Sequence, residues 1–381
     1  MASQSLALVD VLADIPDFRQ SQGKRYSLVA VLSLMVAAML CGYKSYSAIA
    51  QWGRFYGHCL VQALGFATEK TPCAATLHTI LSQLDKTLLE NRLAHWVDAL
   101  LQAHQEPQVS REAIAIDGKS LRGSKKQGAL NAHLLSVLSQ RLGLTLLQQA
   151  VADKTNEIGV IEELLKGLFL QGKIVTCDAL LTQRKVAKTI VDEGGDYVMV
   201  VKENQPELRA IVEGAIEGIP FYREETEVGA SLDCGHGRVE ERKLQATSVL
   251  SGQEEIWPGL EQVFCIERQI VEKKSGKARR EVVYGVTSLS REEASANDLL
   301  KYVRGHWQIE NRLHWVRDVT YGEDHSQVRK GNLPQAMAAL RNTAIGLMRL
   351  AGEMNIAKAC RKYAAQPWQA LRLIGIQQKT E

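Results

Sequence analysis

The chain has 381 residues, 45% of them hydrophobic and 23% charged, with a formal net charge of +3. This length predicts two or three domains with ample core, and the composition excludes a low-complexity or fibrous protein. The seven scattered cysteines, odd in number and without a CxxC pair, argue against a zinc-finger module and indicate reduced thiols in the cytoplasm.

The N-terminal part, residues 1–105, is predicted to be a helical domain. Its apolar run 28–41 is too short to span a bilayer comfortably, so we expect a buried helix, capped by Ser27 and ended by Gly42, and no membrane partner. The first ten residues lack the basic start of a signal peptide. Three further helical patterns follow, at 45–57, 74–84 and 86–104.

After a polar linker the pattern changes to strands. A short apolar strand ends at Asp117, two more strands follow, and a later buried-type strand ends at Asp178. Helices precede and follow that last strand, and the next strand ends before Lys202. This order predicts a mixed α/β sheet flanked by helices. The strands are expected at 113–117, 134–139, 144–152, 173–178 and 196–201, and the helices at 156–170 and 182–195.

The C-terminal third begins with a different pattern. From about 205 to 292 apolar alternation and glycine-containing turns predict an antiparallel β insertion. Residues 302–318 then predict one amphipathic helix, with Glu310 in the middle and an apolar face that includes Trp307. A clear helix follows at 332–352, with Pro334 near its start, before two shorter helices.

Three acids are candidates for one metal site. Asp117 and Asp178 each end an apolar strand, where α/β sheets usually place ligands, and a helical Glu310 facing the sheet would add a third carboxylate. Oxygen ligands of this kind suit Mg²⁺ or Mn²⁺, and a pair of such ions can assist phosphodiester displacement. Alternatively, each aspartate is a helix cap or turn residue, and Glu310 is an exposed carboxylate paired with Arg312 or His314.

Cations and polar groups border these acids and suit a phosphate substrate. Such groups would position a DNA backbone rather than read its bases, although ordinary loop charge explains each one equally well. Residues 301–381 also carry 13 basic and 6 acidic side chains, which by itself is weak evidence for a polyanion partner. The candidate DNA-binding residues are Lys119, Arg122, Lys125, Lys126, Lys202, His306 and Arg317.

Several motifs in sequence order resemble one family. AIDGKSLRGS, KTNEI, VTCDAL, GGDYVMVVKENQ and HWQIENRLHWVRDVTYGEDHSQVRKGN are similar to the H-repeat-associated family of bacterial insertion-sequence transposases. IPDFRQSQGKRYSL is similar to that family's N-terminal associated domain, so the resemblance covers nearly the whole chain. The family belongs to the DDE superfamily, whose catalytic core is RNase H-like.

The resemblance implies a function and a division of the chain. It implies an N-terminal transposase-associated domain over 1–105, an RNase H-like catalytic domain over 110–345 containing the β insertion, and a helical extension over 346–381. Asp117, Asp178 and Glu310 would be the catalytic triad that binds Mg²⁺. The expected activity is cleavage at the element's terminal repeats and joining to target DNA, by a cytoplasmic, nucleoid-associated protein that is a homodimer on DNA.

Two departures and two alternatives accompany this resemblance. The wider superfamily usually has Arg four residues before the Glu and Lys seven after it, whereas this chain has His306 and Arg317. The stacking Trp of related insertions has only Trp257 as a counterpart, and neighbouring Pro258 favours loop packing. The alternatives are a catalytically silent DNA-binding relic and a zinc hydrolase using His306, Glu310 and His314, which lacks the HExxH arrangement.

Overall fold

The computed structural model describes residues 7–67, 70–104, 111–121, 132–151, 157–218, 226–235, 237–328 and 331–377. The chain divides into two compact units, each described by itself. Residues 109–117 and 155–308 form one, called here the sheet unit. Residues 1–108, 118–154 and 309–381 form the other, called the helical unit.

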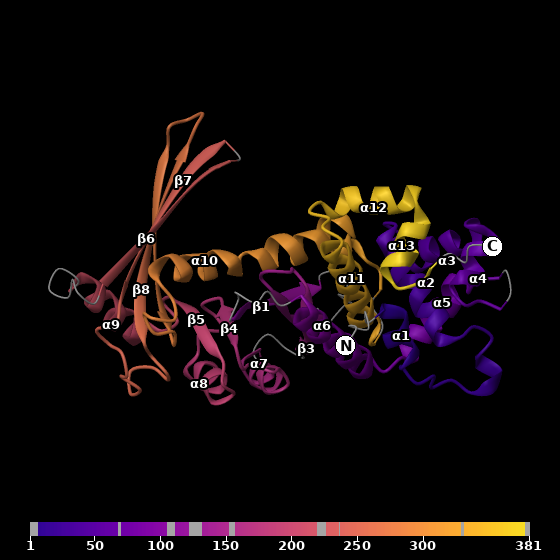
Figure 1. The fold of residues 1–381 in the computed structure, drawn as a ribbon, viewed down its shortest axis with the longest axis horizontal. Helices are drawn as coiled ribbons and strands as arrows, with labels where there is room; N and C mark the ends of the chain where they lie inside the picture. Colours follow the sequence, from indigo (N-terminus) through magenta and orange to yellow (C-terminus); the bar gives the residue numbers. More distant parts are fainter. Residues whose placement is uncertain are drawn as a thin grey trace. The chain divides into compact units, whose positions relative to one another are not determined.

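The sheet unit is built on seven strands in the order β1-β4-β5-β9-β8-β7-β6. β1, β4 and β5 pair in parallel, whereas β9, β8, β7 and β6 continue the sheet in antiparallel pairs, so the sheet is mixed (Figure 1). The strands are β1 Glu112–Leu121, whose first half lies in this unit, β4 Lys173–Cys177, β5 Asp196–Val201, β6 Thr226–Gly235, β7 Arg238–Thr247, β8 Gln262–Glu272 and β9 Ala278–Thr287.

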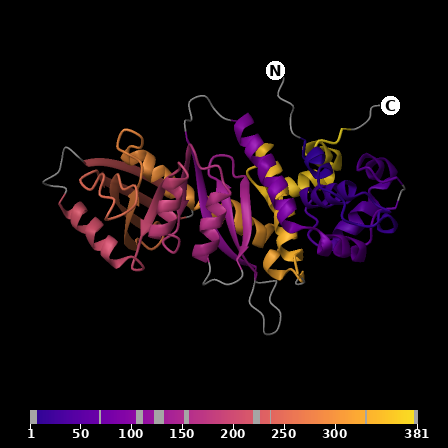
Figure 2. The same ribbon diagram turned by 90° about the horizontal axis from the view of Figure 1, so that it is seen from below.

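Helices cover both faces of this sheet. α10 packs across β4, β5, β6 and β7, where Leu299 and Leu300 join Phe264 and Ile266 in one buried cluster. α9 contacts β7, β8 and β9, and its Arg209 lies over the ring of Tyr284 on the opposite face. Figure 2 shows α8 and α9 on the side away from α10. The helices are α7 Glu157–Lys166, α8 Arg184–Asp192, α9 Pro206–Glu217 and α10 Ala296–His306.

The helical unit packs helices against a small β structure. The second half of β1 lies beside the antiparallel pair β2–β3, and α11, buried along most of its length, contacts α2, α5, α6 and β3. Its elements are α1 Leu8–Ala13, α2 Leu28–Leu40, α3 Tyr46–Phe55, α4 Gly57–Ala63, α5 Ala74–Gln83, α6 Lys86–Ala103, β2 Ala132–Ser139, β3 Thr145–Val151, α11 Leu333–Leu350, α12 Ile356–Ala365 and α13 Pro367–Leu373.

Helix α2 confirms the prediction made from the apolar run. The Ser27 hydroxyl accepts a hydrogen bond from the backbone N–H of Ala30 at 3.3 Å, which satisfies one free donor of the first turn. Gly42 follows the helix at φ +84°, a conformation that glycine adopts without strain. Nearly every α2 residue is buried. Across the described residues, none of the helices has the length and apolar character needed to cross a membrane.

The predicted fold class is confirmed: a mixed sheet flanked by helices, a β-rich insertion and a helical N-terminal region. Within the insertion, the prediction of β structure from about 205 was wrong, because α9 begins at Pro206. Proline at the first helical position has the required φ and no N–H to leave unpaired, so this start was readable from the sequence.

The prediction that the first strand ends at Asp117 was also wrong, because β1 continues to Leu121. Leu121 is buried against Leu134 of β2, and this apolar contact stabilises the longer strand. Gly118 makes the continuation possible, because a Cβ there would lie 2.5 Å from Nε2 of His133. Asp117 still directly follows the last paired residue of β1 against β4.

A single α-helix over 302–318 was predicted and is not observed. α10 begins earlier, where Ser295 and Asp298 form a reciprocal cap, and ends at His306. Two π-helical segments follow, Glu310–His314 and Val316–Thr320. Trp307 was expected on the buried face, but its side chain is 64% exposed, whereas Leu313 and Val316 are buried. The α-helix ends just before Trp307, so the 3.6-residue pattern does not continue unchanged from Trp307 to Leu313 and Val316.

Glu90 lies in a buried polar network of the helical unit. Its carboxylate accepts hydrogen bonds from the amides of Gln148 and Gln335, both at 2.7 Å, and Asn342 donates to Gln148 at 2.8 Å. Burial raises the pKa of Glu90 to about 7, and the two amides only partly offset it. The network therefore joins α6, β3 and α11 around one acid that releases its proton near neutral pH.

We expect this acid to make stability pH-dependent. The unfolded chain ionises it from about pH 4.5, whereas the folded protein keeps the proton to about pH 7. The free energy of unfolding should fall between these two pH values, by about 3 kcal/mol from 1.36 kcal/mol per pKa unit. Urea unfolding from pH 4 to pH 8 measures it. Glu90→Gln should lose this part of the pH dependence, and an unchanged slope in that variant would contradict the assignment.

Candidate active site

Asp117 and Asp178 lie next to one another in the sheet unit. β1 and β4 are parallel, and Ile116 is the residue of β1 that pairs with Cys177 of β4. The two aspartates are the next residues on each strand, so both carboxylates arise where this pair of strands stops. The apolar residues before each aspartate are buried in the sheet. A short apolar strand that ends in an acid therefore places that acid at the end of the strand.

The carboxylate of Asp178 is partly buried. Burial raises the pKa of Asp178, and the negative charge of Asp117 raises it further. The backbone N–H of Leu181, which donates to Oδ1 at 3.1 Å, acts in the other direction. A partly buried carboxylate beside a second acid forms a site where a cation would be favoured.

Two of the predicted DNA-binding cations lie on this side of the sheet unit. The positive charges of His306 and Lys202 both lower the pKa of Asp178, so both groups are close enough to act on it. Nδ1 of His306 lies 3.2 Å from the hydroxyl of Thr176 on β4, two residues before Asp178. Lys202 directly follows β5, the neighbouring strand. The structure therefore gathers Asp117, Asp178, Lys202 and His306.

Glu310 belongs to the helical unit, where it opens the first π-helical segment. Its Oε2 lies 3.2 Å from Nδ1 of His314, and the Glu310 side chain is 55% exposed while His314 is buried. The alternative in which Glu310 is an exposed carboxylate paired with Arg312 or His314 is thus correct in naming His314 as a partner. π-helical turns are rare in proteins, and those that occur are often found at functional sites. The role of Glu310 beside the two aspartates stays a prediction.

The remaining predicted DNA-binding residues have different surroundings. Lys119 is buried, and its Nζ lies 2.6 Å from Oδ2 of Asp318. Arg317 is fully buried and paired with Glu323 at 2.7 Å. Direct contact of either cation with a DNA phosphate would require that these ion pairs open. Arg122, Lys125 and Lys126 lie outside the described residues.

Three residues support this region, and two of them, Thr176 and Thr182, were not among the sequence candidates. Thr176 contacts His306, and Thr182 donates to the carbonyl oxygens of Asp178 and Val200, at 3.0 and 2.8 Å. Asn204 donates to the carbonyl of Ala179 at 2.6 Å. They fix the loop after Asp178. A buried threonine inside the apolar run before Asp178 was the available signal. Trp257 is only 3% exposed, in agreement with the packing role favoured from the sequence.

The donor set fits a hard divalent cation. Carboxylate oxygens are the ligands that Mg²⁺ and Mn²⁺ prefer. The pKa of Asp178 is raised by burial and then by the charge of Asp117, and a bound cation would favour the ionised carboxylate.

Comparisons with known proteins agree on one family. Residues 109–347 match the model of the transposase DDE domain, and residues 9–97 match that of the DDE_Tnp_1-associated domain. The chain is 30% identical over 351 residues to the "Putative transposase YncI" of Escherichia coli O157:H7, covering 90% of this chain and 87% of that protein. It is 28% identical over 354 residues to the "H repeat-associated putative transposase YhhI" of Escherichia coli K12, covering 90% of each.

The family match spans the candidate site and most of the chain. It includes Asp117, Asp178 and Glu310, the three acids singled out by their positions in the sequence. A transposase acts on DNA, and the DDE family implies a divalent metal ion held by acidic side chains. The chain therefore belongs to the DDE transposases, in the H-repeat-associated family of insertion-sequence transposases.

Proposed function

We propose that this transposase cuts DNA at the ends of its element and joins the freed 3′ end to target DNA, using Asp117, Asp178 and Glu310 with Mg²⁺ or Mn²⁺. The observation that carries the proposal is the in-register placement of Asp117 and Asp178 after neighbouring parallel strands. A lone aspartate in this position is commonly a turn residue. Two in register, with His306 and Lys202 acting on one of them, make a site with the polarity that a phosphodiester and a cation require.

The chain limits how far Glu310 can lie from His306, which contacts the strand that leads to Asp178. Glu310 follows His306 by four residues, and four extended residues span at most about 14 Å. His306 in turn contacts Thr176, two residues before Asp178. The Glu310 side chain is 55% exposed, and its carboxylate lies 3.2 Å from Nδ1 of the buried His314. This limit on the distance from His306 supports Glu310 as the third acid of the site.

Each protein group has a distinct part in the proposed chemistry. The three carboxylates would hold the divalent ion, which supplies stabilisation of the attacking and leaving oxygens when bound. Lys202 and the protonated form of His306 would attract the phosphate that enters beside the aspartates. Thr176 fixes one nitrogen of His306, and the Leu181 amide fixes one oxygen of Asp178, so neither group has to be reoriented during the reaction.

The wider setting follows from the same proposal. The partners would be the element's terminal repeats and target DNA, and the protein would act as a homodimer on DNA in the cytoplasm. The N-terminal domain over 1–105, the catalytic domain over 110–345 and the extension over 346–381 would be its functional divisions. Lys119, Arg122, Lys125, Lys126 and Arg317 are kept as candidate DNA contacts, and for Lys119 and Arg317 such contact would require their ion pairs to open.

The test is cleavage of cloned element ends in the presence of Mg²⁺, with the cuts mapped on each strand. We expect a metal-dependent nick that leaves a 3′-OH at the element end, followed by joining of that end to target DNA. DNA binding without a nick in either Mg²⁺ or Mn²⁺ would favour the catalytically silent relic and contradict the proposal.

A further inference from the structure

One face of the β insertion changes character along its length. Residues that pair across strands share a face, and near α10 this face carries Leu244, Ile266 and Val283, which pack in the buried cluster with α10. Two residues further out, the same face carries Arg242, Arg268 and Glu281. Because side chains alternate between the two faces of a strand, these residues belong to one face of the sheet. That face is apolar near α10 and charged in its outer half.

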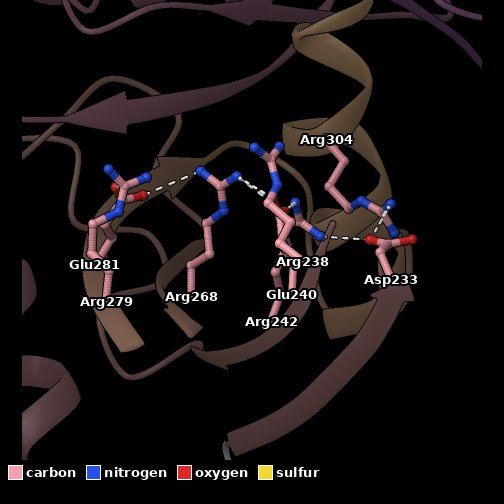
Figure 3. A network of polar contacts seen from close by, with 8 residues as sticks. All are labelled: Asp233, Arg238, Glu240, Arg242, Arg268, Arg279, Glu281 and Arg304. Carbon is pink, nitrogen blue, oxygen red and sulfur yellow. Dashed lines mark hydrogen bonds and ion pairs between the residues drawn. The ribbon is translucent and has the colours of Figure 1, made fainter. Parts of the chain in front are cut away.

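Arginines outnumber acids on this outer half. Figure 3 shows eight charged side chains joined by ion pairs, five of them arginines. Arg304 extends the group from α10, where it lies 2.7 Å from Oδ2 of Asp233. The members, called here the arginine face, are Arg238, Arg242, Arg268, Arg279 and Arg304 with Asp233, Glu240 and Glu281.

The central acid of the arginine face is shared. Glu240 is 6% exposed and is paired with Arg238, Arg242 and Arg268, so one negative charge serves three guanidinium groups. Each guanidinium has five N–H donors, and one carboxylate cannot satisfy all three. The shared pairing also fixes the side chains in place, which lowers the entropy lost when they bind a ligand.

The most exposed cations lie at the edges of this face. Arg279 is 67% exposed and Arg238 47% exposed, whereas Arg242 is 15% exposed. The adjoining turn between β8 and β9 adds exposed cations. It follows one acid, Glu272, the last residue of β8, whose carboxylate accepts a hydrogen bond from Ser275. The turn cations are Lys273, Lys274 and Lys277. The charge surplus is thus greatest where solvent and a large ligand have access.

The arginine face and the candidate active site both have a residue on the last turn of α10. Arg304 is two residues before His306, the group that contacts Thr176 and acts on Asp178. Both ends of this connection belong to the sheet unit. A linear polyanion that lay on the face and followed α10 would arrive at the aspartate pair.

We propose that the arginine face binds the phosphate backbone of DNA and guides it to Asp117 and Asp178. The inference rests on the proposed function and names a surface for its substrate outside the residues predicted from the sequence. Guanidinium forks match phosphate geometry and neutralise its charge, and a pleated row of them follows a repeating polymer. The face takes the backbone irrespective of sequence, because phosphate contacts carry no base information.

The test compares two double variants on the same strands. Arg238→Gln with Arg279→Gln removes the two most exposed arginines of the face, one on β7 and one on β9. The control, Lys243→Gln with Arg280→Gln, removes two cations from the same strands on the opposite face, because Lys243 and Arg280 alternate with the residues above. Binding of a DNA duplex is followed by fluorescence anisotropy at several salt concentrations.

The salt dependence decides the outcome. Two lost phosphate contacts should lower the slope of log affinity against log salt by about 1.8, at roughly 0.9 per contact. The control should keep the wild-type slope, and both variants should keep the wild-type melting temperature. If the test variant keeps the wild-type slope, the inference is overturned. This holds even if the variant differs from wild type in self-association. Nicking by wild type in Mg²⁺ is measured in parallel, so a failure of the proposed function is seen separately.

Discussion

Asp178→Asn should abolish DNA cleavage while leaving DNA binding and the fold intact. Asn keeps the oxygen that accepts the Leu181 N–H but loses the charge that a divalent ion needs. Loss of a group that merely supports a metal ligand costs about 10–100-fold, so loss of a ligand should cost at least about 100-fold. The fold should tolerate the change, because burial and Asp117 already disfavour the charged form of Asp178.

A cleavage time course in Mg²⁺ measures this loss, and a binding titration on the same DNA measures what remains. Asp192→Asn is a matched control, since Asp192 is an exposed acid of the same unit that pairs with Lys188 on α8. It should cut at the wild-type rate. Cleavage by Asp178→Asn at the rate of this control would remove Asp178 from the site.

Glu323→Gln should destabilise the helical unit more than any surface substitution. Burial alone would raise the pKa of Glu323, but Arg317 and Arg341 lower it below its ordinary value. Nε of Arg317 donates to Oε2 at 2.7 Å, and Nη1 of Arg341 donates to Oε1 at 2.8 Å. All three side chains are buried, so Gln would leave two guanidinium charges without compensation at a cost of about 3–5 kcal/mol.

Urea unfolding at neutral pH measures the change, with Glu353→Gln as the control. Glu353 pairs with Lys362 at 2.6 Å, and that lysine is 48% exposed, so its loss should cost about 1 kcal/mol or less. Equal unfolding midpoints for the two variants would show that the buried cluster contributes no more than an exposed pair.

Much of the fold was predictable because burial and capping leave local traces. The apolar run after Ser27 and the apolar strand ending at Cys177 are each determined by a few adjacent residues. The placement of Asp117 and Asp178 directly after the paired residues Ile116 and Cys177 followed from the same local signals. The proline at position 206 was an equally local signal for α9 that the expectation of a β insertion overrode.

Other features depend on partners far away in the sequence. The π-helical turns around Glu310 are set by backbone hydrogen bonding, and apolar spacing alone does not distinguish them from an α-helix. Lys119 was predicted as a loop cation, but it lies in β1, which continues past Asp117. Its ion pair is with Asp318, 199 positions away in the sequence.

The same limit applies to Arg317 and to the arginine face. Arg317 was a reasonable candidate for DNA contact by its position after Glu310, but Glu323 and Arg341 complete a buried cluster that spacing does not reveal. The arginine face depends on the register of four strands, because a shift by one residue would move its arginines to the opposite side.

The most direct test of the central claim is to follow nicking and strand joining by Glu310→Gln on the same DNA in Mg²⁺, beside Glu353→Gln. If Asp117, Asp178 and Glu310 serve one site for both steps, Glu310→Gln should lose both together, while Glu353→Gln retains both. A Glu310→Gln protein that nicks DNA at the wild-type rate, or that loses joining alone, would contradict the account.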